Sequence, residues 1–287
     1  TSSKISKNDW TKPMHNLNRP ENVTVESTGE RANLFSSVLT QAIIKPYPWW
    51  HPKFLGAWLT NNIQLALQSF DYDVHKSAWA DVANAAEEFN EPGKFTTFIG
   101  YEFTASTQVE GGNLHRNVIF NSSKAPIRPW TRIDSLNPED LWTWMDALRD
   151  KGVDSLAMPH NSNGSNGQMF EVETFRGNAI DKEYAEKRMR NEPVVEMTQV
   201  KGTSDTHPLL SPDDEWADFE IMDKRVGSRP PTYSMPQGGY VRDAYLRGLT
   251  LEWKNQGNPY KFGLIGSSDT HTGAGAFDED NYWSKTG

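Results

Sequence analysis

The sequence contains no cysteine, which excludes thiolate catalysis, disulfide bonds and zinc sites built on sulfur ligands. A metal bound by this chain would therefore be held mainly by nitrogen and oxygen ligands. The sequence also has no apolar run close to the roughly 20 residues that a membrane-spanning helix needs. A chain without cysteine fits a periplasmic or secreted protein and also a cytoplasmic one, so its localisation stays open.

Positive charge is scarce relative to negative charge, with 29 Lys and Arg against 38 Asp and Glu and a formal net charge of −9. This balance disfavours a broad surface for the phosphate backbone, so we expect no nucleic-acid partner. A local basic pocket for a small anionic substrate is compatible with it. The 287 residues are enough for a sizeable core, to which 11 Trp and 13 Phe contribute large apolar side chains.

The composition changes near residue 70. Residues 1–70 are rich in Asn, Pro, Ser and Trp, and we predict an irregular N-terminal segment there. Residues 71–287 alternate helix-like and strand-like stretches, a pattern typical of an α/β domain. We expect helices over 74–90, from Asn137 with Leu141, Trp144 and Leu148 buried, over 180–191, from Ser211 and over 240–254. We expect strands over 95–103, 115–120, 155–160, 194–200 and immediately before Asp269.

Ionisable residues lie on or beside these short apolar strands. Asp269 and His271, two residues apart at a strand end in the run FGLIGSSDTHTGAG, project the same way and can bind one metal ion. Glu102, His115 and His160 lie on or next to three other strands. Because an unpaired charge is expensive to bury, a shared divalent cation would resolve that cost for all five residues.

Five segments in order, GYEFT, NLHRNVIF, PHNSNGSNG, EMTQVKGTSDTHP and GLIGSSDTHTG, resemble the bacterial domain-of-unknown-function family 3604. That family is related to the PHP (polymerase and histidinol phosphatase) metallohydrolases. The resemblance covers about residues 71–287 and implies a distorted (β/α) barrel. The superfamily opens with a His-x-His motif that this sequence lacks, so the barrel is expected to be incomplete at its N-terminus, unless His15 or His51 substitutes.

The resemblance also implies a metal site and an activity. Its expected ligands are Glu102, His115, His160, Asp269 and His271, around two or three divalent ions such as Zn, Mn or Fe. The implied activity is phosphoester hydrolysis by a metal-activated water. Further site roles are proton donation by His271 or His207, charge stabilisation by Arg116, and substrate binding by Arg116, Asn161, Lys201 and His207.

Each of these residues also has a purely structural interpretation. Asp269 could cap a helix, Glu102 could pair with Arg116, and His115 could be an exposed strand residue. The other candidate histidines, His160, His207 and His271, could simply form structural hydrogen bonds in their loops. Glu196 could bind at the site or pair with Lys201 or Arg190. The loop 161–167 could present N–H groups to an oxyanion or form an ordinary tight turn.

Two other functions stay open. The same metal chemistry would serve amide or other ester hydrolysis. Alternatively, the chain could be an inactive binding or structural module, with Trp49, Trp50 and Trp58 offering a surface for a partner or a carbohydrate.

Overall fold

The computed structural model describes residues 72–107, 111–226, 232–269, 271 and 280. The chain divides into two compact units, one of residues 1–97 with 125–129 and one of residues 98–124 with 130–287. The predictions for residues 1–70, including those on His15, His51, Trp49, Trp50 and Trp58, lie outside the described residues.

Helix α4 (Tyr72–Phe89) belongs to the first unit and agrees closely with the helix predicted over 74–90. Its buried residue Trp79 donates from Nε1 to the Pro126 carbonyl oxygen at 2.7 Å, which joins the helix to residues 125–129 of the same unit. A turn stabilised by the Lys94 N–H donating to the Glu91 carbonyl follows the helix, where the sequence predicted its end.

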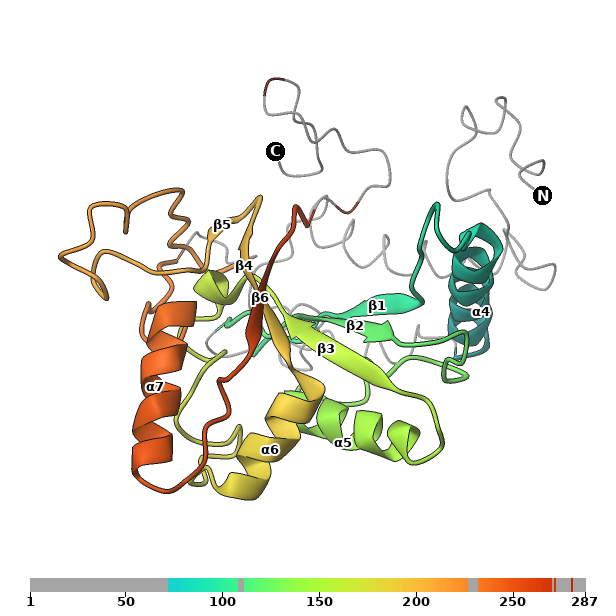
Figure 1. The fold of residues 1–287 in the computed structure, drawn as a ribbon, viewed down its shortest axis with the longest axis horizontal. Coiled ribbons are helices and arrows are strands. Elements are labelled where there is room, and N and C mark those ends of the chain that lie inside the picture. The colour runs from blue at the N-terminus through green and yellow to red at the C-terminus, as the bar shows by residue number, and fades with distance from the viewer. Residues whose placement is uncertain (1–71, 108–110, 227–231, 270, 272–279, 281–287) are drawn as a thin grey trace, which may run out of the picture. The chain divides into compact units, whose positions relative to one another are not determined.

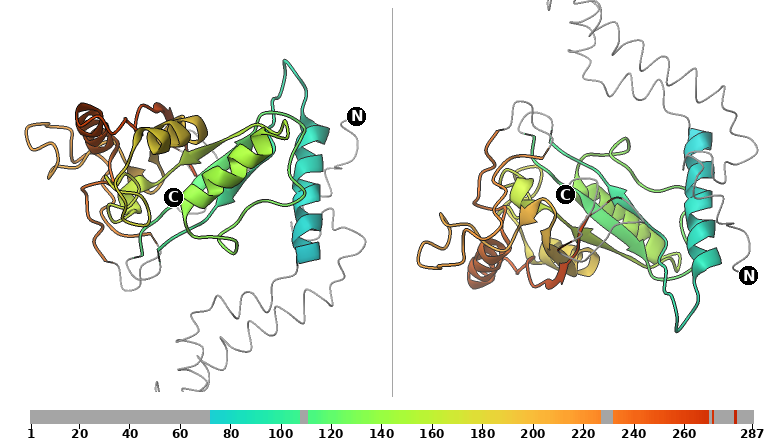
Figure 2. Two further views of the ribbon diagram at one scale, coloured as in Figure 1. Left: turned by 90° about the horizontal axis from the view of Figure 1, so that it is seen from below. Right: turned by 90° about the horizontal axis from the view of Figure 1, so that it is seen from above.

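The second unit begins with an antiparallel sheet of three strands in the order β1 (Gly100–Phe103), β2 (Arg116–Phe120) and β3 (Ser155–Pro159) (Figure 1). In β2, buried Arg116, Val118 and Phe120 alternate with the half-buried Asn117 and Ile119, as expected for two different faces. Helices α5 (Pro138–Arg149) and α6 (Lys182–Asn191) pack beside β3 and each other. The views in Figures 1 and 2 agree that α5 lies along this sheet.

Helix α5 begins where the sequence predicted, because Asn137 caps it: its Oδ1 accepts the Glu139 backbone N–H at 2.9 Å, and Pro138 follows. Its buried face differs from the predicted one. Leu141 is buried as expected, but Trp142 and Met145 are buried where Trp144 and Leu148 were predicted to be. The face of α5 that packs against the core is therefore rotated about the helix axis relative to the predicted face.

The cap of α5 gives a direct stability test. Asn137→Ala is expected to lower the free energy of unfolding by about 1 kcal/mol, because the Glu139 N–H loses its acceptor at the helix start. Urea titration followed by circular dichroism measures this. Lys151→Ala, an exposed position just after the same helix, is the control and should stay within about 0.5 kcal/mol of wild type. Equal effects of the two substitutions would contradict a stabilising cap.

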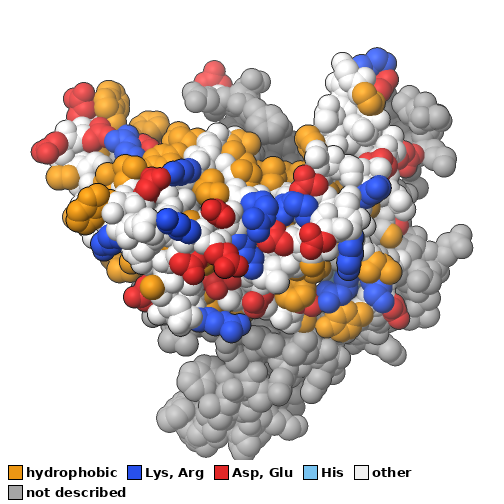
Figure 3. Space-filling view, turned by 60° about the horizontal axis from the view of Figure 1, so that its bottom comes forward, with side chains coloured by type: hydrophobic (Ala, Val, Ile, Leu, Met, Phe, Trp, Pro, Cys, Tyr) orange, Lys and Arg blue, Asp and Glu red, His pale blue; other side chains and the backbone are white. Residues whose placement is uncertain are grey.

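Acidic and basic side chains intermix over the helices. Asp146 of α5 accepts from Arg149 at 2.6 Å and from Arg190 of α6 at 2.7 Å, so the two helices are joined through one carboxylate. Figure 3 shows such charges of both signs interspersed on one face of the molecule. Among the described residues, no helix is both long and apolar enough to cross a membrane.

A second sheet has the order β5 (Gly202–Thr203), β4 (Val194–Gln199) and β6 (Gly263–Gly266), with β4 and β6 parallel. Helix α7 (Val241–Trp253) precedes β6 and matches the helix predicted over 240–254 within one residue at each end. Strand β3 packs beside β4. The ends of β3 and β4 are therefore close in space, which brings the first sheet's residues near those of the second.

Several expectations need correction. The described residues form a mixed α/β structure of two small sheets and four α-helices, without a closed barrel, and the first sheet is antiparallel. The strand predicted over 95–103 is formed only from Gly100 onward. No helix starts at Ser211, because local hydrogen bonds compete with it: the Ser211 hydroxyl pairs with Thr206, and Asp214 accepts the Trp216 N–H.

Candidate metal centre

The antiparallel register of the first sheet brings Glu102, His115 and His160 together. Phe103 and Pro159 both lie directly opposite Arg116, so these three residues share the face covered by the helices. Side chains alternate along a strand, and therefore Glu102, His115 and His160, each one residue away, lie toward the other face. Because β2 runs antiparallel, its start lies at the edge where β1 and β3 end.

Glu102 is the centre of this cluster. Its Oε1 lies 2.7 Å from His115 Nδ1 and 3.2 Å from His160 Nε2, and its Oε2 lies 3.7 Å from His271 Nε2. The potential ligand atoms of Glu102, His115 and His160 all lie within 4.8 Å of one another. Three imidazoles from three separate parts of the chain thus surround a single carboxylate.

His271 reaches Glu102 from the segment after β6, whereas Asp269 contacts His271 and Lys201 and lies outside the group of ligand atoms that Glu102, His115 and His160 form. His271 Nδ1 lies 2.6 Å from the Asp269 carbonyl oxygen, which can only accept, so Nδ1 carries the proton and Nε2 is left facing Glu102. Both residues have left-handed backbone, with φ of 52° and 56°. The Asp269 carboxylate is ion-paired with Lys201 and accepts from Gln199 Nε2 at 2.9 Å.

The electrostatics of the cluster keep Glu102 ionised. Burial acts to raise the pKa of Glu102, but hydrogen bonds and positive charge from His115 and His160 outweigh it and hold that pKa far below its usual range. Burial lowers the pKa of His115, and the Glu102 carboxylate offsets this only in part. An ionised carboxylate beside a neutral imidazole is the protonation state that a metal ion requires of its ligands.

Asn113, which the sequence analysis did not identify, fixes the two strand-end histidines relative to each other. Its Nδ2 donates to the carbonyl oxygens of His160 at 3.3 Å and Asn161 at 3.1 Å, while its Oδ1 accepts the His115 N–H at 3.1 Å. The side chain is 2% exposed, so these bonds form away from water. The sequence offered one signal for this role: Asn113 lies two residues before the candidate ligand His115.

The loop after His160 is built as a buried turn. It forms the 3₁₀ turn η3 (Ser162–Gly164), and its backbone N–H groups donate within the protein. The N–H of Asn163 donates to Ser204 Oγ at 3.2 Å and that of Asn166 to Ser234 Oγ at 2.9 Å. These donors are engaged with protein acceptors, which favours the tight-turn interpretation over an oxyanion cradle.

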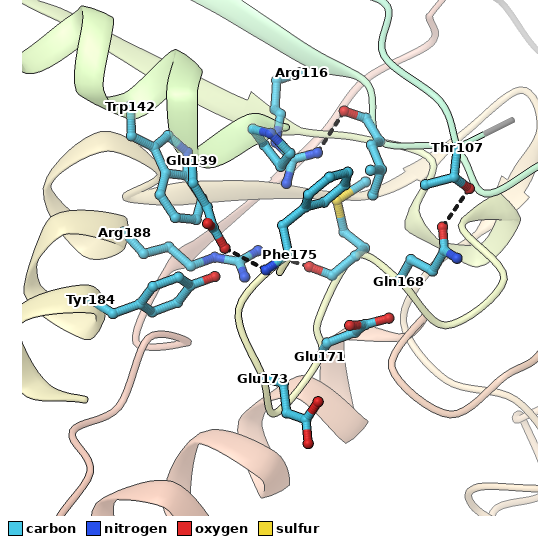
Figure 4. Close-up of a pocket in the computed structure, with 13 residues that line it drawn as sticks. Thr107, Arg116, Glu139, Trp142, Gln168, Glu171, Glu173, Phe175, Tyr184 and Arg188 are labelled. Atoms are coloured by element: carbon cyan, nitrogen blue, oxygen red, sulfur yellow. Dashed lines mark hydrogen bonds between the residues drawn. The ribbon is translucent and has the colours of Figure 1, made fainter. Parts of the chain in front are cut away.

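Arg116 lies on the helix side of the sheet, away from the cluster. Its Nε donates to Glu192 Oε1 at 2.7 Å, and Arg188 Nε donates to Glu192 Oε2 at 3.1 Å. Trp142 Nε1 also donates to Glu192 at 2.8 Å. Arg116 and Arg188 line a cavity of about 160 Å³ on that side, shown in Figure 4 with Trp142, Tyr184 and Phe175. The structure therefore gives Arg116 a buried counter-ion and places it apart from Glu102.

The structure also places the remaining predicted substrate-binding residues. His207 accepts the Leu209 N–H at 3.1 Å and contacts the Tyr240 ring, and these partners lie outside the Glu102 cluster. Asn161 donates from Nδ2 to Asn163 Oδ1 at 2.7 Å, within the loop. Lys201 lies at the cluster through its ion pair with Asp269. Among His207, Asn161 and Lys201, it is therefore Lys201 that contacts one of the predicted metal ligands, Asp269.

Glu196 of β4 lies against the same group of residues. It is 3% exposed, and burial raises its pKa; the charge of His160 and hydrogen bonds from Gln199 and the Asn161 backbone only partly offset this. The structure does not pair it with Arg190, which instead binds Asp146. Glu196 thus belongs to the surroundings of His160.

The donor set fits a divalent transition metal. Imidazole nitrogens and carboxylate oxygens are ligands that Zn, Mn and Fe share, and sulfur is not needed. Glu102, His115 and His160 present such atoms from a rigid sheet, and His271 adds a fourth near Glu102. The site is therefore suited in chemistry to hold a cation.

Comparison with known proteins places the chain in a family. The model of the family described as "Protein of unknown function (DUF3604)" matches residues 2–287, so the chain belongs to this family. The search of curated proteins and the search of solved structures found no match. The match includes the five segments that suggested the family from the sequence, and it extends over residues 2–70 as well.

Proposed function

We propose that this chain is a divalent-metal-dependent hydrolase that uses a metal-activated water, and that its substrates are phosphoesters. The observation that carries the proposal is the convergence of His115, His160 and His271 on the ionised carboxylate of Glu102. Glu102 lies in β1, His115 precedes β2, His160 follows β3 and His271 follows β6, so the cluster draws on four separate parts of the chain. Such clusters of perturbed ionisable residues are frequent at functional sites.

The residues take separate roles in this proposal. Glu102, His115, His160, Asp269 and His271 would hold the cation, which when bound supplies Lewis acidity and lowers the pKa of water. Glu102 contributes the negative charge that offsets the cation's charge, and Asn113 fixes the strand-end histidines. Lys201, beside Asp269, would bind the anionic group of the substrate.

The choice of phosphoesters rests on the resemblance to PHP metallohydrolases, as does the proposal that a complete family member forms a PHP-like barrel with two or three ions. The ligand set alone is equally suited to amide or carboxylic ester hydrolysis. A panel of the three substrate types, assayed with added Mn or Zn, distinguishes these reactions. If the chain hydrolyses the phosphoester and neither the amide nor the carboxylic ester, the result would support phosphoesters as the substrates.

The metal site is tested by elemental analysis of the purified chain and of the Asp269→Ala/His271→Ala variant. The wild type is expected to carry bound Zn, Mn or Fe. The double variant should lose the metal and at least about 100-fold in kcat/KM, equal to roughly 2.7 kcal/mol. The reason is that two of the five expected ligands are removed at once.

A matched control exists, because the tetrapeptide Ser-Asp-Thr-His occurs twice, at 204–207 and 268–271. Asp205→Ala/His207→Ala removes the same two residue types from the first copy, where Asp205 pairs with Arg242 instead of the cluster. This variant should keep its metal. Absence of metal from the wild type, or equal loss from both variants, would contradict the proposal and favour a binding or structural module.

A further inference from the structure

Two buried polar atoms next to the cluster have no hydrogen-bond partner among the described residues: His160 Nδ1 and Glu196 Oε2. His160 is 2% exposed and Glu196 is 3% exposed, so bulk water does not reach either group freely. Leaving a buried donor or acceptor without a hydrogen-bond partner destabilises the folded protein. Two such groups in one region therefore call for a common explanation.

The two atoms are chemically complementary and belong to neighbouring elements. His160 follows β3, Glu196 lies within β4, and these strands pack side by side. The two atoms are not hydrogen-bonded to each other in the structure. The charge of His160 and the backbone N–H of the next residue, Asn161, both act to lower the pKa of Glu196. An imidazole N–H can donate and a carboxylate oxygen can accept.

The remaining contacts of both side chains set their direction. The other ring nitrogen of His160, Nε2, already faces Glu102 Oε1 at 3.2 Å. Asn161, the residue after His160, has φ of 52°, a left-handed backbone conformation. Gln199, which lies on β4 with Glu196, donates from Nε2 to Asp269 at 2.9 Å, so β4 also contacts the segment that carries His271.

We propose that Glu196 is a positioning residue that accepts a hydrogen bond from the protonated Nδ1 of His160 when the site binds a metal ion, and thereby holds Nε2 toward Glu102. This inference rests on the proposed metal-dependent function and extends it to a residue outside the expected ligand set. Metal-binding histidines commonly donate their second ring N–H to a carboxylate, which fixes the tautomer and the ring orientation. Glu196 would give His160 this support.

The test is a long-range proton–nitrogen NMR spectrum of protein labelled with ¹⁵N-histidine, recorded without metal and with Zn²⁺. The His160 signals are assigned by their loss in His160→Gln. We expect a proton on His160 Nδ1 in both states of the wild type and a Zn²⁺-induced shift at Nε2. In Glu196→Gln, the Nδ1 signal should shift and the Kd for Zn²⁺ should rise about 10–100-fold. Glu183→Gln, an exposed position on α6, should match the wild type.

The outcomes separate this inference from the proposed function. A His160 Nδ1 without a proton in the wild type would overturn the role of Glu196, and this result needs no variant to fold. An unchanged Nδ1 signal in a folded Glu196→Gln would overturn it too. If Zn²⁺ shifts no cluster imidazole in the wild type, the metal-dependent function fails. The Nδ1 proton and its response to Glu196→Gln would still decide whether Glu196 positions His160.

Discussion

Glu192→Ala is expected to lower the free energy of unfolding by about 3–5 kcal/mol, the largest stability effect of a single substitution that we predict. Glu192 is 1% exposed and is the shared counter-ion of Arg116 and Arg188, which are also buried. Without it, two guanidinium groups would stay in the core with no carboxylate beside them. Such a loss is a large part of the roughly 5–15 kcal/mol that stabilises a typical domain.

Urea unfolding of the wild type and the variant measures this effect. Glu252→Ala is the matched control, because Glu252 forms an exposed ion pair with Lys261, and exposed pairs contribute little to stability. If both alanine variants lose the same small amount, the buried network would not be the stabilising element that its contacts indicate.

The ion pairs of Glu192 with Arg116 and Arg188 also predict that the free energy of unfolding falls at low pH. Burial acts to raise the pKa of Glu192, but the charges of Arg116 and Arg188 outweigh it and hold that pKa below its usual 4.5. Since the folded-state pKa is lower, the contribution of Glu192 is fully present above the unfolded-state pKa of about 4.5 and is lost as pH falls through the folded-state pKa. Glu192→Gln should therefore show a shallower loss of stability below about pH 4 than the wild type.

Sequence patterns predicted the elements whose signals are local. Helix α5 begins at Pro138, directly after its cap Asn137, and α7 occupies the predicted stretch, because capping residues and apolar spacing act within a few residues. The helix predicted from Ser211 was wrong, although it had the same kind of signal. There Asp214 caps only a turn and pairs with Arg242 of α7, a contact that no local pattern reveals.

In the candidate site, too, the residues with a local sequence signal could be identified, whereas contacts between distant parts of the chain could not. Glu102, His115, His160, Asp269 and His271 could be identified because each ionisable residue lies on or beside a short apolar run. Strand alternation could also have indicated that Arg116, adjacent to His115, faces the other side of the sheet. Glu196 lies in such a run as well and could be named as a candidate from the sequence. Its position near His160, like the pairing of Glu192 with Arg116 and Arg188, depends on how separate elements pack.

Glu102→Gln is expected to weaken Zn²⁺ binding by more than about 100-fold, beyond the 10–100-fold that loss of an outer hydrogen-bond partner typically costs. The substitution keeps the size of the side chain but removes the negative charge that faces His115, His160 and His271. A cation would then meet imidazoles alone at this end of the site. Calorimetric titration with Zn²⁺ measures the change, and phosphoester turnover with added Mn or Zn should fall with it.

Two further variants separate loss of charge from loss of fold. Glu215→Gln removes a carboxylate at an exposed position and should bind Zn²⁺ as the wild type does. Glu102→Asp keeps the negative charge on a shorter side chain. A Zn²⁺ affinity between those of Glu102→Gln and the wild type would show that both the charge and the length of the side chain matter. Wild-type affinity in a folded Glu102→Gln would mean that Glu102 only pairs with its histidines, and the metal centre would have to be abandoned.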